Sequence, residues 1–188
     1  MSVRGDLSRK KILEVARGLF AAKGFSAVTM QDICDNTGLS RGGLYRHYAS
    51  TEEVFADIIK EEQTAAFAAL ENAKRLKIAP DTILFGFLRS RIGQLLKLES
   101  SIDNATAEFA ARSELGRRLL QDRAQASVQI ITEILEFGVA QGVFSCENCR
   151  AMALHIMWCL EGMGKHNALF PVKEEIETQL GIIARELK

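Results

Sequence analysis

A short segment, residues 29–48, carries the side chains best suited to contact a polyanion. Its second half groups five residues that can donate hydrogen bonds to phosphate oxygens or base edges: Arg41, Tyr45, Arg46, His47 and Tyr48. Two adjacent glycines, Gly42 and Gly43, lie among them. Each costs about 1 kcal/mol relative to alanine inside a helix. Nothing within the predicted helix compensates for this cost, so the pair favours close approach of the backbone to another surface.

Two short helices joined by a tight turn are predicted to position these side chains. Thr29 and Ser40 are suitable N-caps for the two helices, and Gly38 can adopt the positive φ that the turn requires. Ile33 and Leu44 are expected to face inward and to hold the helices together. This arrangement is typical of a helix-turn-helix, whose second helix enters the major groove of DNA.

The charge distribution agrees with a polyanion partner for this end of the chain. Residues 1–50 hold eight basic and four acidic side chains, a net charge of +4, whereas the whole 188-residue chain is neutral and the remainder therefore carries −4. Such an asymmetry between segments indicates that the basic segment meets a polyanion.

The rest of the chain has the 3.6-residue hydrophobic period of helices, and the expected fold is all-α with nine helices. Beside the two short helices, the second ending near His47, the expected ranges are Ser8–Lys23, Ser50–Leu76, a helix after Pro80, Asp103–Ala111, Ser113–Gln141, Cys146–Leu169 and a last helix after Pro171. A polar joint at Glu99–Ser101 is expected to precede the helix from Asp103. The run Ile83–Leu88 is apolar on all sides, which predicts a helix buried all round.

Several classes of protein are disfavoured by composition. No apolar run approaches the roughly 18–20 residues of a membrane span, and the polar N-terminus lacks the features of a signal peptide, so we expect a cytoplasmic protein without a membrane partner. No Ser-His-Asp order, phosphate loop or HExxH motif is present, which predicts no enzyme activity, no cofactor and no metal.

Residues 10–55 resemble the tetracycline-repressor (TetR/AcrR) family of bacterial transcriptional regulators. The resemblance is carried by Ile12 through Phe20, Gly24-Phe25, Thr29-x-x-x-Ile33, Thr37-Gly38-Leu39-Ser40 and Gly43-Leu44-Tyr45-x-His47-Tyr48-x-Ser50. It implies a DNA-binding domain at residues 1–48 and a ligand-binding and dimerisation domain at 49–188. It also implies a homodimer built on the last two helices, a palindromic double-stranded operator and a repressor that a small molecule releases from DNA.

The motif positions and their neighbours supply the DNA-contact candidates: Lys10, Thr29, Ser40, Arg41, Gly42, Gly43, Tyr45, Arg46, His47 and Thr51. Arg9 and Lys11, beside Lys10, are further expected phosphate contacts. Arg41, and with it Arg46, is expected to read guanine edges. Thr51 departs from the family pattern, which usually has lysine there, and this puts one phosphate contact in doubt.

The effector is expected to be partly apolar, because ligand pockets are mostly apolar with a few polar groups. Four residues are predicted to touch it: Phe85, Phe109, His155 and Trp158. Each also has the plainer interpretation of a core or surface residue.

Three alternatives remain open at this point. The pair Cys146 and Cys149 forms C-x-x-C, which indicates either a cap with a buried thiol or a redox or metal role. The stripe Ile176, Leu180, Ile183 and Leu187 fits either internal packing or a dimer interface. The whole chain also fits a co-activator of the same fold that acts through a protein partner without binding DNA.

Overall fold

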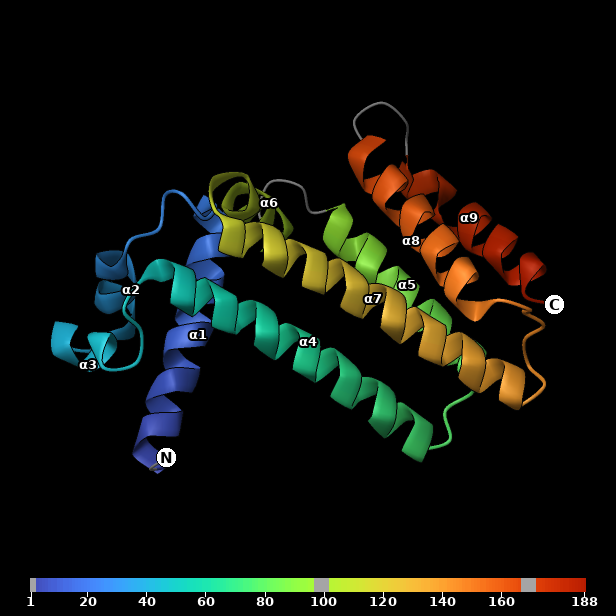
Figure 1. Ribbon diagram of the computed structural model, residues 1–188, viewed down its shortest axis with the longest axis horizontal. Coiled ribbons are helices and arrows are strands. Elements are labelled where there is room, and N and C mark those ends of the chain that lie inside the picture. Colours follow the sequence, from blue (N-terminus) through green and yellow to red (C-terminus); the bar gives the residue numbers. More distant parts are fainter. Residues whose placement is uncertain (1–2, 97–101, 167–171) are drawn as a thin grey trace. The chain divides into compact units, whose positions relative to one another are not determined.

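The computed structural model describes residues 3–96, 102–166 and 172–188, and within them the chain is helical without strands. Figure 1 shows the nine helices of this part of the chain. Their bounds are α1 Val3–Lys23, α2 Met30–Thr37, α3 Arg41–Tyr45, α4 Thr51–Arg75, α5 Pro80–Leu95, α6 Ile102–Arg112, α7 Glu114–Ala140, α8 Cys149–His166 and α9 Val172–Glu186. The predicted all-α class with nine helices is confirmed.

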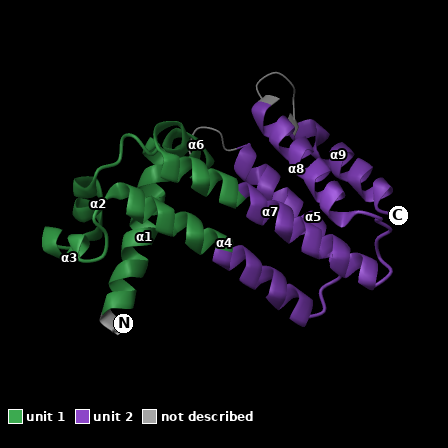
Figure 2. Cartoon of the chain, viewed as in Figure 1, with its two compact units in different colours: residues 1–63, 98–123 green, residues 64–97, 124–188 purple. Residues whose placement is uncertain are grey.

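The chain forms two compact units, coloured separately in Figure 2. The first unit comprises residues 1–63 and 98–123, and the second comprises 64–97 and 124–188. Two long helices, α4 and α7, each contribute to both units. Helix α6 packs against α1 and completes the core of the first unit. The predicted domain boundary between residues 48 and 49 stays a prediction.

Four phenylalanines form the centre of the first unit. Phe25 stacks on Phe109 with ring centroids 4.3 Å apart, and Phe20 meets the edge of Phe55 at 4.8 Å. These residues come from α1, the loop after it, α4 and α6. Burying four aromatic side chains fixes these segments against one another, and so provides a rigid base for α2 and α3.

The second unit has a separate aliphatic core from α5, α7, α8, α9 and the end of α4. In α5 the buried residues are Pro80, Leu84, Leu88 and Ile92, spaced four apart along one helical stripe. The expected burial of Ile83–Leu88 on all sides is wrong, since Gly86 is exposed and Phe85 and Phe87 are half-buried. The apolar run therefore predicted more burial than the neighbouring segments provide.

Two helix starts differ from the sequence-based expectation. Helix α1 begins at Val3 rather than Ser8, since no residue interrupts the helix before Ser8 and Asp6 in the first turn suits the helix dipole. Helix α8 begins at Cys149 rather than Cys146, because Asn148 Oδ1 accepts the Ala151 N–H at 2.9 Å and caps the helix there. The expected joint at Glu99–Ser101 and the break at Pro171 lie outside the described residues. In the part of the chain that the structure covers, no helix combines the length and the apolarity that crossing a bilayer requires.

Candidate nucleic-acid interface

The first helix of the predicted motif is capped at both ends. The Thr29 hydroxyl accepts the Asp32 N–H at 3.1 Å, and the Asp32 carboxylate accepts the Thr29 N–H at 2.9 Å. The hydroxyl also donates to this carboxylate. These bonds from the Thr29 side chain and backbone, with that from Lys23, hold the pKa of Asp32 at about 2. At the other end Gly38 adopts φ 67°, so the turn has the left-handed glycine that the sequence predicted.

The second helix, α3, is only five residues long and depends on its cap. Ser40 Oγ accepts the Gly43 N–H at 3.2 Å, and Leu44 is fully buried. Gly43 is buried too, and a Cβ built on it would lie 3.2 Å from Ser40 Oγ. Gly43 thus has a packing role inside the motif, and its contact with DNA stays a prediction. Gly42 is exposed with nothing within 4 Å of such a Cβ, so it remains a place where another backbone could approach.

The other proposed DNA contacts are accessible. Exposed residues among them are Lys10, Thr29, Ser40, Arg41, Gly42, Tyr45 and Arg46, and the half-buried ones are His47 and Thr51. The Arg41 guanidinium carbon lies 5.9 Å from the centre of the Tyr45 ring, so these two side chains form one surface on α3. The Thr29 hydroxyl donates its proton to Asp32, so a phosphate contact there would have to replace that bond.

Tyr48 and Arg9 are not part of this exposed surface. Tyr48 is buried, and its hydroxyl donates to Asp57 Oδ2 on α4 at 2.5 Å. Burial and this hydrogen bond raise the pKa of Tyr48 far above its usual range, so the hydroxyl stays protonated. Arg9 Nη2 lies 2.8 Å from Asp57 Oδ2, and Arg9 Nη1 donates to Glu61 at 2.9 Å. Two carboxylates already bind the Arg9 guanidinium, so a phosphate contact there would have to compete with them and stays a prediction.

Helix α6 holds the loop that leads into the motif. Glu108 Oε2 accepts the Ser26 N–H at 3.0 Å, and this bond lowers the pKa of Glu108. Gly24 in the same loop has φ 78°, and a Cβ there would lie 2.3 Å from Glu108 Oε1. Glycine at this position thus allows the carboxylate to approach the loop backbone closely.

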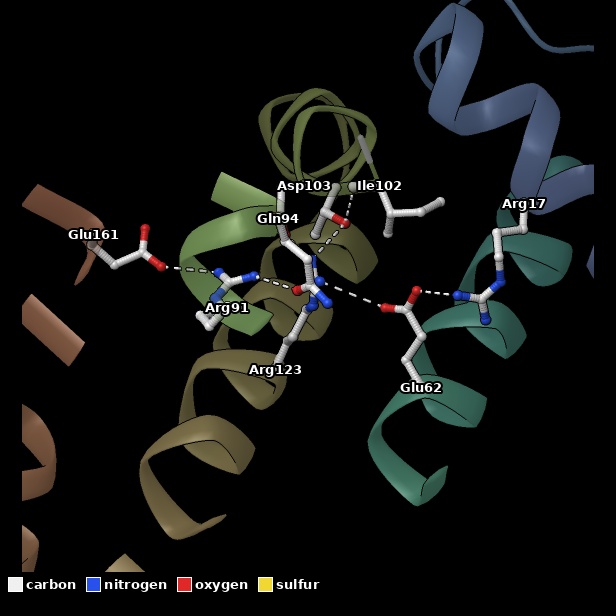
Figure 3. Close-up of polar contacts among 9 residues, drawn as sticks. Arg17, Glu62, Arg91, Gln94, Ile102, Asp103, Arg123 and Glu161 are labelled. Carbon is white, nitrogen blue, oxygen red and sulfur yellow. Dashed lines mark hydrogen bonds and ion pairs between the residues drawn. The ribbon is translucent and has the colours of Figure 1, made fainter. Parts of the chain in front are cut away.

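A chain of alternating charges joins four helices of the first unit (Figure 3). Glu62 on α4 pairs with Arg17 on α1 and, at 3.5 Å, with Arg123 on α7. Arg123 Nη1 also lies 2.5 Å from Asp103 Oδ1 on α6. Sequence reasoning missed this cluster and the Asp57 and Glu108 contacts, because their partners are distant in sequence and only an excess of acidic residues in α4 hinted at them.

The four predicted effector contacts belong to different units: Phe109 to the first, and Phe85, His155 and Trp158 to the second. Phe109 lies in the aromatic core of the first unit, where it stacks on Phe25, and its contact with an effector stays a prediction. Trp158 and His155 are exposed on α8, Trp158 with 69% of its surface accessible, because the opposite side of α8 packs into the core. Contact of these two residues with an effector stays a prediction. Phe85 packs against the core of the second unit and remains a candidate.

The last helix buries its predicted stripe within its own chain. Leu180, Ile183 and Leu187 are buried in the second unit, and Ile176 packs beside them. Of the two interpretations of this stripe, internal packing is the correct one. A dimer contact by α9 must therefore use another side of the helix, on which Ile182 is exposed.

The C-x-x-C pair has the features of a structural element. Cys149 Sγ lies 4.0 Å from the Cys146 carbonyl oxygen, and burial raises the pKa of Cys149 to about 11. A thiol with a raised pKa is a poor nucleophile near neutral pH. Within the described residues no group of three or more histidine, cysteine or acidic side chains is placed to bind a metal ion.

Comparison with known proteins gives one consistent result. The model of "Bacterial regulatory proteins, tetR family" matches residues 12–58. An HTH-type transcriptional regulator of Bacillus subtilis, YfiR, is 32% identical over 146 residues, which cover 74% of this chain and 69% of that protein. The HTH-type transcriptional repressor KstR2 of Mycobacterium tuberculosis is 25% identical over 144 residues, or 72% of this chain and 68% of its own.

Solved structures agree on the fold. The crystal structure of the reduced form of Escherichia coli NemR aligns with a TM-score of 0.77 over 96% of this chain and 98% of that chain. Its sequence identity is 14%, so the likeness concerns the fold alone.

Proposed function

Because the chain belongs to the tetR family of bacterial regulatory proteins, we propose that it is a transcriptional repressor that a small-molecule effector releases from a palindromic operator. The observation that carries this proposal is the surface of α3. Arg41, Tyr45 and Arg46 are exposed on a short helix whose backbone is fixed by the Ser40 cap and by buried Leu44. Side chains of these types donate to phosphates and base edges, and the rigid helix holds them together for insertion into a major groove.

The name of one relative favours repression over activation. KstR2, which is similar over most of its length, is named a repressor. The co-activator alternative depended on the replacement of the family lysine by Thr51. The exposed Arg41 and Tyr45 favour DNA binding over that alternative, since a protein that did not bind DNA would have no need to present them.

A homodimer through α8 and α9 completes the proposal, and TetR regulators usually dimerise. Trp158 on α8 and Ile182 on α9 are large apolar side chains left exposed by the single chain. A second copy that covers both helices would bury these residues. In such a dimer two copies of α3 could contact successive major grooves, about 34–36 Å apart.

The proposed effector site lies in the second unit, where Phe85 is a candidate lining residue beside the core. A shift in DNA affinity requires that the effector bind the free and the DNA-bound conformations with different affinities. A screen for compounds that release the protein from its DNA site would therefore identify the effector.

Selection of DNA by the protein tests the proposal. The purified chain is incubated with random-sequence duplexes, bound DNA is amplified, and gel shifts then compare the selected duplex with a scrambled one. We expect enrichment of an inverted repeat, and an affinity that falls steeply with salt as phosphate contacts release counterions. Tyr45→Ala should weaken binding while the melting temperature stays nearly unchanged. Failure of a folded dimer to enrich any sequence would contradict the proposal.

A further inference from the structure

Helix α3 has few contacts of its own and needs an anchor at its C-terminal end. It spans five residues, and its side-chain anchor in the core is Leu44. The chain after it turns at once, with the His47 and Tyr48 N–H groups both donating to the Leu44 carbonyl, at 2.9 and 3.2 Å. Backbone hydrogen bonds therefore join Tyr48 to α3, so a displacement of Tyr48 also displaces Tyr45, Arg46 and His47.

The Tyr48 side chain makes a directional contact with the rest of the first unit. Its ring is buried, and its hydroxyl donates to Asp57 Oδ2 at 2.5 Å. Packing fixes how deeply the Tyr48 ring is buried. The hydrogen bond also fixes the direction in which the hydroxyl points, since such bonds weaken steeply as the angle departs from linear. The hydroxyl can thus specify an orientation that a phenylalanine ring would leave open.

The acceptor of this bond is itself held in place. Arg9 Nε donates to the same Asp57 Oδ2 at 3.0 Å, and Arg9 also pairs with Glu61, one turn further along α4. The Asp57 carboxylate is largely covered, with 26% of its side chain accessible. One oxygen therefore links α1, α4 and the segment after α3. Hydrogen bonds that involve a charged group are stronger than neutral ones, so the bonds to this carboxylate can hold the three segments in place.

We propose that Tyr48 and Asp57 are positioning residues for DNA recognition: their hydrogen bond sets the orientation of α3 relative to α1 and α4. This inference rests on the proposed DNA-binding function. Base readout requires donors on α3 to meet base edges within hydrogen-bond distance, whereas phosphate attraction tolerates small rotations. Loss of the bond therefore lowers specific binding and leaves non-specific binding nearly unchanged.

Tyr48→Phe is the primary test, because it removes only the hydroxyl and keeps the ring. Wild type and variant are titrated with the duplex that the wild-type protein selects from the random pool, and with a scrambled duplex. We expect the affinity for the selected duplex to fall roughly tenfold, about the discrimination that one well-placed base contact supplies. Affinity for the scrambled duplex should change less than about twofold, and the melting temperature should fall only slightly.

A charge-matched pair of variants separates orientation from electrostatics. Asp57→Ala and Glu61→Ala each remove one carboxylate that pairs with Arg9, but only the first removes the acceptor of Tyr48. We expect Asp57→Ala to lower the specific-to-scrambled affinity ratio like Tyr48→Phe, and Glu61→Ala to leave it within about twofold. The double variant Tyr48→Phe/Asp57→Ala should lose no more of this ratio than Asp57→Ala alone.

Three outcomes would overturn the inference. One is an unchanged affinity ratio in Tyr48→Phe. The second is additivity of the two substitutions, which would mean that the groups act independently. The third is an equal loss on both duplexes together with a large fall in melting temperature, which would indicate a purely structural role. If the wild-type protein selects no sequence, the proposed function fails instead, and the two failures are thereby distinguished.

Discussion

Arg123 Nη2 lies 3.5 Å from Glu62 Oε2, and this pair joins α7 to α4 close to the point at which each helix leaves the first unit. Both side chains are mostly covered, with 17% and 24% of their surfaces accessible. Glu62 also pairs with Arg17 and Arg123 also pairs with Asp103, so the contact lies at the centre of a network of four helices.

Removal of Arg123 should destabilise the protein measurably. Arg123→Ala leaves the carboxylates of Glu62 and Asp103 without a shared partner, and we expect a loss of about 1–3 kcal/mol in the free energy of unfolding. Urea denaturation followed by circular dichroism measures it. Arg118→Ala is the control, because Arg118 is exposed and pairs with exposed Glu114 at 3.5 Å; its effect should stay within about 0.5 kcal/mol. Equal effects of the two substitutions would show that the network contributes nothing.

The capping box of α2 should make stability depend on acid pH. The pKa of Asp32 is about 2 in the folded protein, against 3.8 for the unperturbed group. A carboxyl with a lowered pKa stabilises the folded state above its unfolded pKa, and this stabilisation is lost as pH falls through the folded pKa. We therefore expect Asp32→Asn to lower the melting temperature near neutral pH, and the gap to wild type to close between about pH 4 and about pH 2. A gap that is the same at every pH would contradict this assignment.

The two neighbouring glycines should respond in opposite ways to alanine. Gly42→Ala places a methyl group in open space and should stabilise α3 by up to about 1 kcal/mol through helix propensity. Gly43→Ala brings a methyl group to 3.2 Å from Ser40 Oγ and should cost about 1 kcal/mol, because the cap must shift. Thermal melts measure both changes. If Gly42 is where DNA approaches the backbone, gel shifts should show that the more stable Gly42→Ala protein binds its selected duplex more weakly.

Phe109 should behave as a core residue of the first unit. It is 1% exposed and stacks on Phe25, so Phe109→Ala should cost about 3–5 kcal/mol in the free energy of unfolding. Phe85→Ala, which truncates a half-buried ring in the second unit, should cost clearly less. Chemical denaturation measures the loss in the free energy of unfolding for both variants. A small loss for Phe109→Ala would favour a ligand contact over a core role for Phe109.

The exposed tryptophan of α8 should be required for dimerisation. Trp158→Glu introduces a charge into the proposed interface, where it would be buried without a partner, and should convert the dimer to monomers at micromolar concentration. Light scattering after gel filtration measures the mass. Val143→Glu is the control, since Val143 is exposed in the segment between α7 and α8. A Trp158→Glu protein that stays dimeric would place the interface elsewhere.

Local patterns in the sequence were sufficient for the recognition motif. Thr29, Gly38 and Ser40 act within a few residues of themselves, through caps and a left-handed turn, so their roles follow from residue type and spacing. Hydrophobic period likewise predicted nine helices, because each amphipathic helix buries one stripe whatever its partner is.

Only the tertiary structure decided which partner each stripe and each charge meets. Phe109 and Phe85 look alike in sequence, yet one completes the core beside α1 and the other lies in the second unit. Tyr48 and Tyr45 are three residues apart, yet one donates to Asp57 on α4 and the other remains exposed. Contacts between residues so distant in the chain depend on how the helices pack. A periodic pattern specifies that a face is buried without specifying what covers it.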